Sequence, residues 1–360
     1  MKLASYNDGS RDGHLVVVSR DLGWAHYASG VATRMQQVLE DWDFLAPQLE
    51  ELSISLNHGR ARHAFPFEPA KCLAPLPRAH QWCVAPAWPQ EAVQEVTQEA
   101  AVSAATPLVW RGAGDALLGP CASPALVRAE ARPAEEALGL DVEAQWVVVT
   151  ADVPAGSRPA EAQERVRLVG LAAAWWQREV LAQERARGQA PLHAWPATSF
   201  SPVLVTPDEL GEAWRAGKMR LPLRLSRNGD SLGHCHGGRD MLWSPGQLLA
   251  WLARHQRLSA GTLLGLGPVR PAEAAWPVPP RPGSRAKPEA AFTEGRLGAC
   301  SLADLRALAA RQTPPQLPPP WLAAGDQVTL DVLGADGHSV FGAIQAVLTE
   351  QGDEVPEVQA

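Results

Sequence analysis

The sequence lacks several features that mark common protein classes. Its 32 Lys and Arg and 39 Asp and Glu residues are interspersed, with no basic run and no acidic tail, and the net charge is -7. Nucleic-acid-binding faces need clustered basic residues, so we expect no nucleic-acid partner. The stretch MKLASYNDGSRDGHL has no signal-peptide apolar segment, and no apolar run approaches membrane-spanning length. We therefore expect a cytoplasmic protein with no membrane partner.

Cysteine is scarce and shows no pairing pattern. The five cysteines are Cys72, Cys83, Cys121, Cys235 and Cys300. An odd, scattered set without Cys-x-x-Cys argues against a disulfide framework and a structural zinc site, and fits reduced thiols. The stretch GHCHGGRD does gather metal-ligand types: His234, Cys235, His236 and Asp240. It lacks the four-ligand spacing of zinc sites, so we interpret it as a polar loop.

Tyrosine and phenylalanine are also few, with 2 and 6 residues against 14 tryptophans. Much of the aromatic bulk is therefore indole, which needs a partner for its N–H group when it is buried. The chain has 360 residues and 46% hydrophobic content. That is enough for a globular protein with one large domain or two ordinary ones.

Turn signals and apolar periodicity predict a mainly β chain with some helices. Hairpins are expected at Asp12-Gly13, Asn228-Gly229 and Asp336-Gly337. Helices are expected within residues 32–56, from about Glu161 to Arg187, and in SPGQLLAWLARHQRL, which a strand in GTLLGLG follows. Residues 1 to about 80 form a small N-terminal module that ends in the Pro-rich stretch CLAPLPRAHQW.

One predicted strand, LDVEAQWVVVT, places Glu143 and Gln145 on the same face, because side chains two residues apart in a strand point the same way. A Glu-x-Glu pair would offer two carboxylates to a divalent cation, and Glu-x-Gln offers half that charge. Three interpretations are open: a metal site, a damaged metal site, or a strand with a polar face.

Several stretches, in order and over nearly the whole chain, resemble the fumarylacetoacetate hydrolase family, most closely its bacterial two-domain members. They include MKLASYNDGSRDGHLVVVSRD, DVEAQWVVVTADVP, PATSFSPVLVTPDELGEAWRAGKMRLPL, RNGDSLG, QLLAWLARHQRLSAGTLLGLGPV and GDQVTLDVLGADGHSVFGAI. The resemblance implies a mainly β, mixed α+β fold. A small N-terminal β-rich domain, residues 1–80, would precede a fumarylacetoacetase-type mixed β-sandwich or β-roll domain, residues 81–350. Residues 351–360 would be a disordered tail, and the large domain would form a homodimer.

The resemblance also implies an activity, the hydrolysis of a C–C bond in a diketo acid. Carboxylates would hold Mg²⁺ or Ca²⁺, and a His-Glu pair would activate water. Carried over residue by residue, it retains Glu143 as a metal ligand and Arg178 as a substrate-binding candidate. Gln145 and Ala174 occupy the positions of two further carboxylate ligands.

Other family positions are substituted as well. Trp195 stands where relatives place a lysine, and Gly267-Pro268 stands in place of a Gly-Thr pair. The loop that supplies the catalytic histidine in relatives has no histidine here, and Glu91 is nearest to that position. We therefore predict no catalytic residue in this loop.

Tryptophans cluster at these former site positions. We interpret Trp175, Trp176 and Trp195 as residues that fill the old pocket. The resulting hypothesis is a catalytically impaired or non-catalytic relative that needs no cofactor, and that binds a small molecule or pairs with an active family member. The alternative is an active fumarylacetoacetase or acylpyruvase-type hydrolase with Mg or Ca, in which ligands such as Asp152 or Glu179 come from elsewhere.

Overall fold

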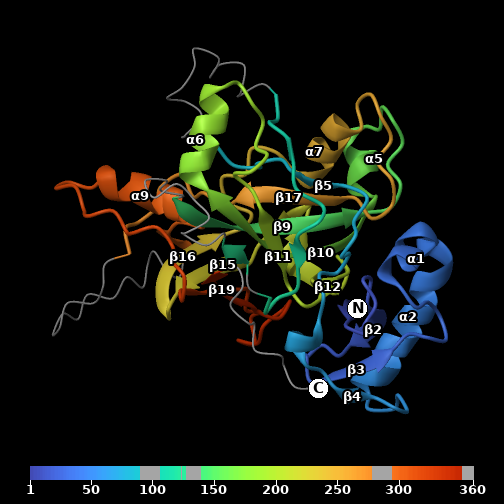
Figure 1. The fold of residues 1–360 in the computed structure, drawn as a ribbon. Helices are drawn as coiled ribbons and strands as arrows, with labels where there is room; N and C mark the ends of the chain where they lie inside the picture. Colours follow the sequence, from blue (N-terminus) through green and yellow to red (C-terminus); the bar gives the residue numbers. More distant parts are fainter. Residues whose placement is uncertain (90–105, 123, 127–138, 278–293, 351–360) are drawn as a thin grey trace.

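The computed structural model describes residues 1–89, 106–122, 124–126, 139–277 and 294–350. One large sheet and one smaller sheet form the framework, and short helices lie around them (Figure 1). The predicted fold class, a mainly β chain with mixed α+β character, is confirmed. The predicted tail, residues 351–360, lies outside the described residues.

The large sheet has twelve strands, and its N-terminal part joins the rest of the sheet directly. Its path is β4 (Phe65–Pro66), β3 (Trp24–Tyr27), β2 (His14–Val18), β1 (Lys2–Tyr6), β12 (Leu204–Val205), β10 (Val166–Gln177), β9 (Leu140–Thr150), β17 (Leu263–Pro268), β5 (Trp82–Val84) and β6 (Trp110–Arg111). β11 (Ala197–Phe200) pairs with β10 and with β7 (Leu117–Leu118). Cα pairing of Lys2 with Val205 and of Leu3 with Leu204 makes the sheet continuous.

The smaller sheet has five strands in the order β18 (Arg296–Gly298), β16 (Asp230–His236), β15 (Pro222–Arg227), β19 (Gln327–Asp331) and β20 (Ile344–Val347). Two short ribbons complete the strands: β13 (Trp214–Arg215) with β14 (Lys218–Met219), and β8 (Ala125–Leu126) with β21 (Thr349–Glu350). The predicted Asn228-Gly229 hairpin is confirmed between β15 and β16, and both residues have positive φ.

The interpretation of GHCHGGRD as a polar loop is wrong for its first half. His234, Cys235 and His236 lie in β16, and Cys235 is fully buried between the strands and the core. The physical reason is pairing on both sides: β15 and β18 both bond to β16, so its alternate residues must enter the interior.

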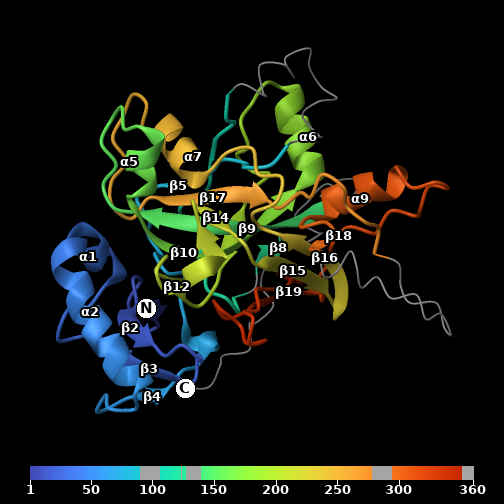
Figure 2. The same ribbon diagram turned by 180° about the vertical axis from the view of Figure 1, so that it is seen from behind.

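The helices lie at the edges of this framework. They are α1 (Met35–Glu40), α2 (Trp42–Asn57), α5 (Pro159–Gln163), α6 (Arg178–Ala186), α7 (Pro245–Leu252) and α9 (Leu302–Ala310), with single 3₁₀ turns at η1 (Pro69–Lys71) and η3 (Gly211–Ala213). Both views place α1 and α2 beside the N-terminal strands, and α9 on the far side of the molecule (Figures 1 and 2). Among the described residues, no helix combines the length and apolar character that a bilayer crossing requires.

The helix expected from about Glu161 to Arg187 is wrong in its central part. Its ends are helical, in α5 and α6, but the centre is the strand β10, which pairs with β9 along almost its whole length. The run VRLVGLAAAWW is apolar on every side, so periodicity could not separate a buried strand from a buried helix. The sheet decides the outcome, because β10 is buried on both faces.

Alternate side chains of β10 pack in two separate hydrophobic cores. Ala173 and Trp175 pack in the core that also contains Trp146 and Phe341, whereas Ala172, Ala174 and Trp176 pack in a second core. Side chains of successive strand residues point to opposite faces, and this assignment follows that rule. Residues of β9 and β10 can therefore be assigned to one face of the sheet or the other.

Candidate functional site

The register of β9, β10 and β17 brings several predicted site residues onto one face of the sheet. Glu143 lies directly opposite Ala174, Gln145 lies opposite Ala172, and Pro268 pairs with Gln145 on the other side. We call this surface the Glu143 face. It comprises Asp141, Glu143 and Gln145 of β9 with Ala172, Ala174 and Trp176 of β10.

The carboxylate of Glu143 is bonded to a guanidinium. Arg178, the first residue of α6, donates from Nη2 to Glu143 Oε1 at 2.7 Å and from Nε to Asp141 Oδ2 at 2.8 Å. The Arg178 guanidinium also lies 5.3 Å from the centroid of the Trp176 ring. The cation that Glu143 contacts in this structure is therefore a side chain of the same chain.

Asp141 ties this ion pair to the beginning of α9. Its carboxylate accepts the backbone N–H groups of Leu302 and Ala303 at 2.7 and 3.2 Å. These are donors in the first turn of a helix, which have no partner within the helix. Asp141 is almost fully buried, and burial raises the pKa of its carboxyl group, whereas the Arg178 guanidinium and the oriented N–H groups stabilise its charged form.

Burial and charge act against each other at Arg178. Removal from water disfavours the charged guanidinium, but the carboxylates of Asp141 and Glu143 outweigh this effect and raise the pKa of Arg178. Nearby, burial would raise the pKa of Asp304, yet Arg270, with Nε 2.7 Å from Asp304 Oδ2, holds that pKa below its usual value. Both arginines therefore stay charged and paired.

Gln145 also has its oxygen engaged. Oε1 accepts the backbone N–H of Gly267 at 2.8 Å, and the side chain is fully buried. A Cβ on Gly265 would lie 2.5 Å from Oε1, so the backbone of β17 approaches this amide closely. Within the described ranges, Nε2 of Gln145 has no acceptor. The free group at this position is a donor, whereas a metal ligand must supply a lone pair.

Aromatic rings cover the space beside Ala174. Trp176 and Trp195 stack with ring centroids 5.0 Å apart, and Trp82 packs edge-on against Trp195 at 5.7 Å. Thr198 Oγ1 accepts the indole N–H groups of both Trp82 and Trp195, at 3.2 and 3.1 Å. The three indoles are nearly fully buried, so they form a packed cluster and not an open cleft.

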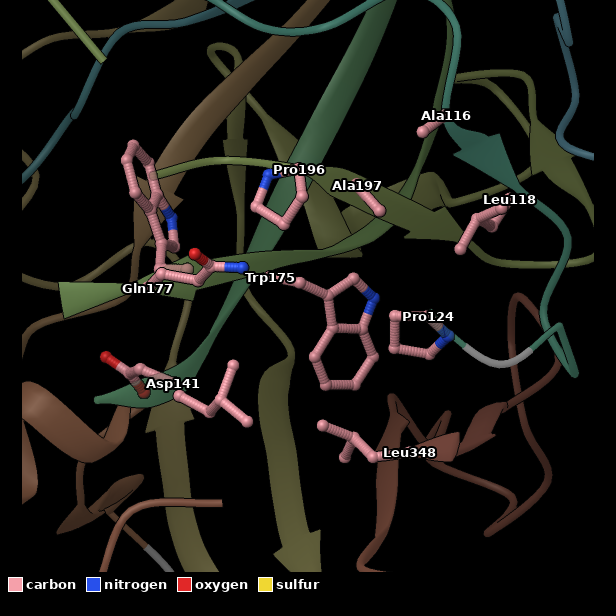
Figure 3. Close-up of a pocket in the computed structure, with 11 residues that line it drawn as sticks. Ala116, Leu118, Pro124, Asp141, Trp175, Gln177, Pro196, Ala197 and Leu348 are labelled. Carbon is pink, nitrogen blue, oxygen red and sulfur yellow. The ribbon is translucent and has the colours of Figure 1, made fainter. Parts of the chain in front are cut away.

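Trp175 is not part of this cluster, because it lies on the opposite face of β10. Its indole donates to Ser199 Oγ at 3.0 Å and forms one wall of a cavity of about 250 Å³. Figure 3 shows the ring between Pro196 and Ala197 on one side and Pro124 and Leu348 on the other. Trp176 therefore stacks on Trp195, whereas Trp175 packs in the other core, and Trp175 and Trp176 both line this cavity.

The other candidates lie away from the Glu143 face or outside the described residues. Glu91, nearest to the expected histidine position, is not among the described residues. Asp152 follows the opposite end of β9 and accepts the backbone N–H of Ala260 at 2.8 Å. Glu179 is exposed on α6, and His236 lies in the smaller sheet. Neither Asp152 nor Glu179 supplies a missing ligand here.

Sequence reasoning missed Asp141, Trp82 and Thr198. The signal for Asp141 was present, because Asp141, Glu143 and Gln145 alternate along one strand and so share a face. Trp82 and Thr198 carry no such signal, since their contact depends on strands far apart in the sequence.

Among the residues that the structure describes, no group of three or more His, Cys, Asp and Glu side chains could hold a metal ion.

Comparison with known families gives two matches that together span nearly the whole chain. The model described as fumarylacetoacetase N-terminal domain 2 matches residues 1–78, and that described as fumarylacetoacetate (FAA) hydrolase C-terminal matches residues 82–348. No curated protein sequence matches the chain.

Solved structures with the same fold include three that cover the chain almost completely. A putative HpcE protein from Mycobacterium smegmatis has a TM-score of 0.61 at 17% identity, covering 98% of this chain and 100% of its own. Fumarylacetoacetate hydrolase from psychrophilic Exiguobacterium antarcticum has a TM-score of 0.61 at 16% identity, and it also covers 98% of this chain and 100% of its own. Maleylpyruvate hydrolase from Sphingobium sp. SYK-6, in complex with manganese(II) and pyruvate, has a TM-score of 0.60 at 13% identity. That match covers 97% of this chain and 99% of the hydrolase. At these identities the likeness shows the fold alone.

Proposed function

Because the chain belongs to the fumarylacetoacetate hydrolase family, we propose that it is a non-catalytic member in which an internal ion pair and a tryptophan cluster have replaced the metal site. It keeps the fold of hydrolases and isomerases but does not cleave diketo acids. Its role is that of a binding protein or a partner subunit.

The observation that carries this proposal is the bond between Arg178 and Glu143. A guanidinium 2.7 Å from Oε1 occupies one oxygen of the carboxylate that a divalent cation would need. A metal ion at the other oxygen, Oε2, would compete with Arg178 for the charge of Glu143 and would repel the guanidinium that also balances Asp141. Breaking a buried pair is costly, because it leaves a charge without compensation.

The remaining donor set does not fit a divalent cation either. The relative from Sphingobium was solved with manganese(II), a metal that favours oxygen ligands. On the Glu143 face, Gln145 Oε1 is taken by Gly267, Ala174 presents a methyl group, and Trp195 lies beside them. Mg²⁺ and Ca²⁺ each need several oxygen ligands. We therefore derive no catalytic step through a metal ion.

Calorimetry and a turnover assay test the proposal on the wild-type chain. We expect no saturable heat on titration with Mg²⁺ or Mn²⁺, and no hydrolysis of an acylpyruvate. The maleylpyruvate hydrolase from Sphingobium is the matched positive control for its own substrate. Tight Mg²⁺ binding together with turnover of a diketo acid would show instead an ordinary active hydrolase of the family, and would overturn the proposal.

We also propose that the chain forms a homodimer through its large domain. Leu192, Leu242 and Val347 are apolar side chains exposed on that domain, and an interface that covers them would bury apolar surface. Light scattering at micromolar concentrations should give about twice the mass of one 38.6 kDa chain. A mass equal to a single chain at every concentration would contradict the dimer.

A further inference from the structure

A second cavity, of about 830 Å³, lies between the N-terminal strands and the large domain. Its walls combine charged and apolar side chains. The lining includes Lys2, Arg20, Asp21, Glu209, Leu210 and Asp336. We call it the Lys2 cavity. It involves none of the residues of the Glu143 face.

Lys2 lies in the wall of this cavity with its amine held in place. Nζ donates to the carbonyl oxygens of Arg20 at 2.8 Å and Val340 at 2.7 Å, and both of those residues also line the cavity. Only 5% of the Lys2 surface is exposed. In the described part of the chain, no carboxylate forms an ion pair with Nζ, and no third hydrogen-bond partner is present.

This geometry suits a neutral amine. A neutral amine has two N–H groups and one lone pair, and the two carbonyl oxygens accept the two N–H groups. The fourth position on nitrogen, which carries the lone pair, then has no partner among the described residues. Lysines desolvated in this way are the usual nucleophiles toward carbonyl carbons.

We propose that Lys2 is a nucleophilic site that captures a neutral aldehyde or ketone as an imine. Nζ forms a bond to the carbonyl carbon, the carbonyl oxygen leaves as one molecule of water, and the amine supplies both hydrogens of that water. No oxidant or reductant is needed. The site is independent of the proposed function, because it uses neither a metal nor the Glu143 face.

The charge of the lining selects the class of carbonyl compound. Four carboxylates, those of Asp21, Glu209, Glu212 and Asp336, line the cavity against the two cations Lys2 and Arg20. Arg20 is already paired, with Nε 2.6 Å from Glu209 Oε1. An anionic keto acid would therefore meet net repulsion, whereas a neutral carbonyl compound would not.

Acid–base chemistry supports the same assignment. Burial lowers the pKa of Lys2 to about 8. The carboxylates of Glu209, Asp336 and Asp21 act to raise this pKa, and the charge of Arg20 lowers it further. At pH 7 about a tenth of the amine is therefore unprotonated. An ordinary lysine, with a pKa near 10.4, is almost entirely protonated there.

The test is competitive reductive trapping on the full chain. Butanal and sodium cyanoborohydride at pH 7.5 convert any imine into a stable butyl-lysine, and peptide mass spectrometry assigns it. The chain has only four lysines, so Lys71, exposed and paired with Glu68 at 2.9 Å, is an internal reference within the same sample. We expect Lys2 to be modified at least tenfold faster than Lys71. Fragment ions separate Lys2 Nζ from the amine of Met1.

Two comparisons complete the experiment. Glyoxylate in place of butanal should modify Lys2 more slowly relative to Lys71, and Lys2→Arg should remove the fast site while leaving Lys71 labelling unchanged. Modification of Lys2 no faster than Lys71 overturns the proposal. A preference of Lys2 for glyoxylate overturns the assignment of a neutral ligand. Both outcomes are read on the wild type and do not depend on whether the variant folds.

Discussion

The Glu143 face and the Lys2 cavity differ in how their buried ionisable groups are stabilised. On the Glu143 face, two carboxylates share one guanidinium, and indole rings fill the adjoining space. In the Lys2 cavity, an amine rests on two carbonyl oxygens beside about 830 Å³ of free volume. Each charge of the first region has a partner, and a cavity of about 250 Å³ lined by Asp141, Trp175 and Trp176 adjoins it. The second region combines a larger cavity with a buried amine that has no carboxylate partner among the described residues.

The two regions differ in whether a buried charged side chain has a partner of opposite charge. A buried ion pair is weak evidence for stability. A buried amine beside free volume, with a pKa lowered by desolvation, is a candidate for a functional site. Substitutions can test each half of this comparison.

The largest expected effect is on the tryptophan cluster. Trp195→Lys removes an indole that is 2% exposed, together with its stacking on Trp176 and its bond to Thr198, and places a charge in the gap. We expect the free energy of unfolding to fall by about 4–5 kcal/mol in urea denaturation. Trp24→Lys is the control, because Trp24 is 49% exposed, and its effect should be much smaller. Equal midpoints for wild type and Trp195→Lys would mean an open pocket.

The next effect concerns the ion pair. Arg178→Met leaves Asp141 and Glu143 without their shared guanidinium, and loss of one partner of a buried pair should lower the free energy of unfolding by about 3–4 kcal/mol. The same measurement on Arg158→Met, which breaks a solvent-exposed pair with Glu161, should show little change.

A rescue variant shows whether charge is the cause. Adding Asp141→Asn and Glu143→Gln to Arg178→Met removes the uncompensated carboxylates, so much of the lost stability should return. If the triple variant were as unstable as the single one, lost packing of the Arg178 side chain over Trp176 would explain the effect instead.

Local sequence signals predicted much of the fold, and pairing between strands that are distant in the sequence determined the rest. The Asn228-Gly229 turn and the alternation in β9 are encoded within a few residues, so both were predicted correctly. β10 was not, because its apolar run satisfies a helix as well as a buried strand. Pairing with β9, β11 and β12 resolves that ambiguity.

The sites depend even more on distant partners. Family resemblance identified Glu143, Gln145, Ala174 and Arg178 as positions of one site, and strand alternation placed the first two together. The bond from Arg178 to Asp141 spans 37 residues, and that from Lys2 to Val340 spans 338. No local pattern marks Lys2 as buried, so its cavity could not be predicted from the sequence.

A smaller effect is expected when carboxylates are restored to the Glu143 face. Gln145→Glu with Ala174→Asp adds two carboxylates beside Glu143, and attraction to a divalent ion grows with ligand charge. We expect a dissociation constant of about 1 mM for Mg²⁺, so 10 mM Mg²⁺ should stabilise the variant by about 1.4 kcal/mol and leave wild type unchanged. Acylpyruvate turnover should remain absent, because a metal alone does not position a water. Equal Mg²⁺ stabilisation of wild type would contradict the interpretation of Gln145 and Ala174.

The smallest expected effect is the pH dependence that Lys2 adds to stability. Burial lowers its pKa to about 8 in the folded protein, from 10.5 in the reference state. Between these values the unfolded chain binds more protons than the folded chain, so raising the pH through this window favours folding. Relative to Lys2→Met, wild type should gain about 1 kcal/mol between pH 8 and pH 9, measured by urea denaturation at each pH. Lys71→Met, which removes an exposed lysine, should track wild type across the same range. A difference between wild type and Lys2→Met that stays constant with pH would mean that the amine is as well solvated as that of a surface lysine, and the contrast with the Glu143 face would disappear.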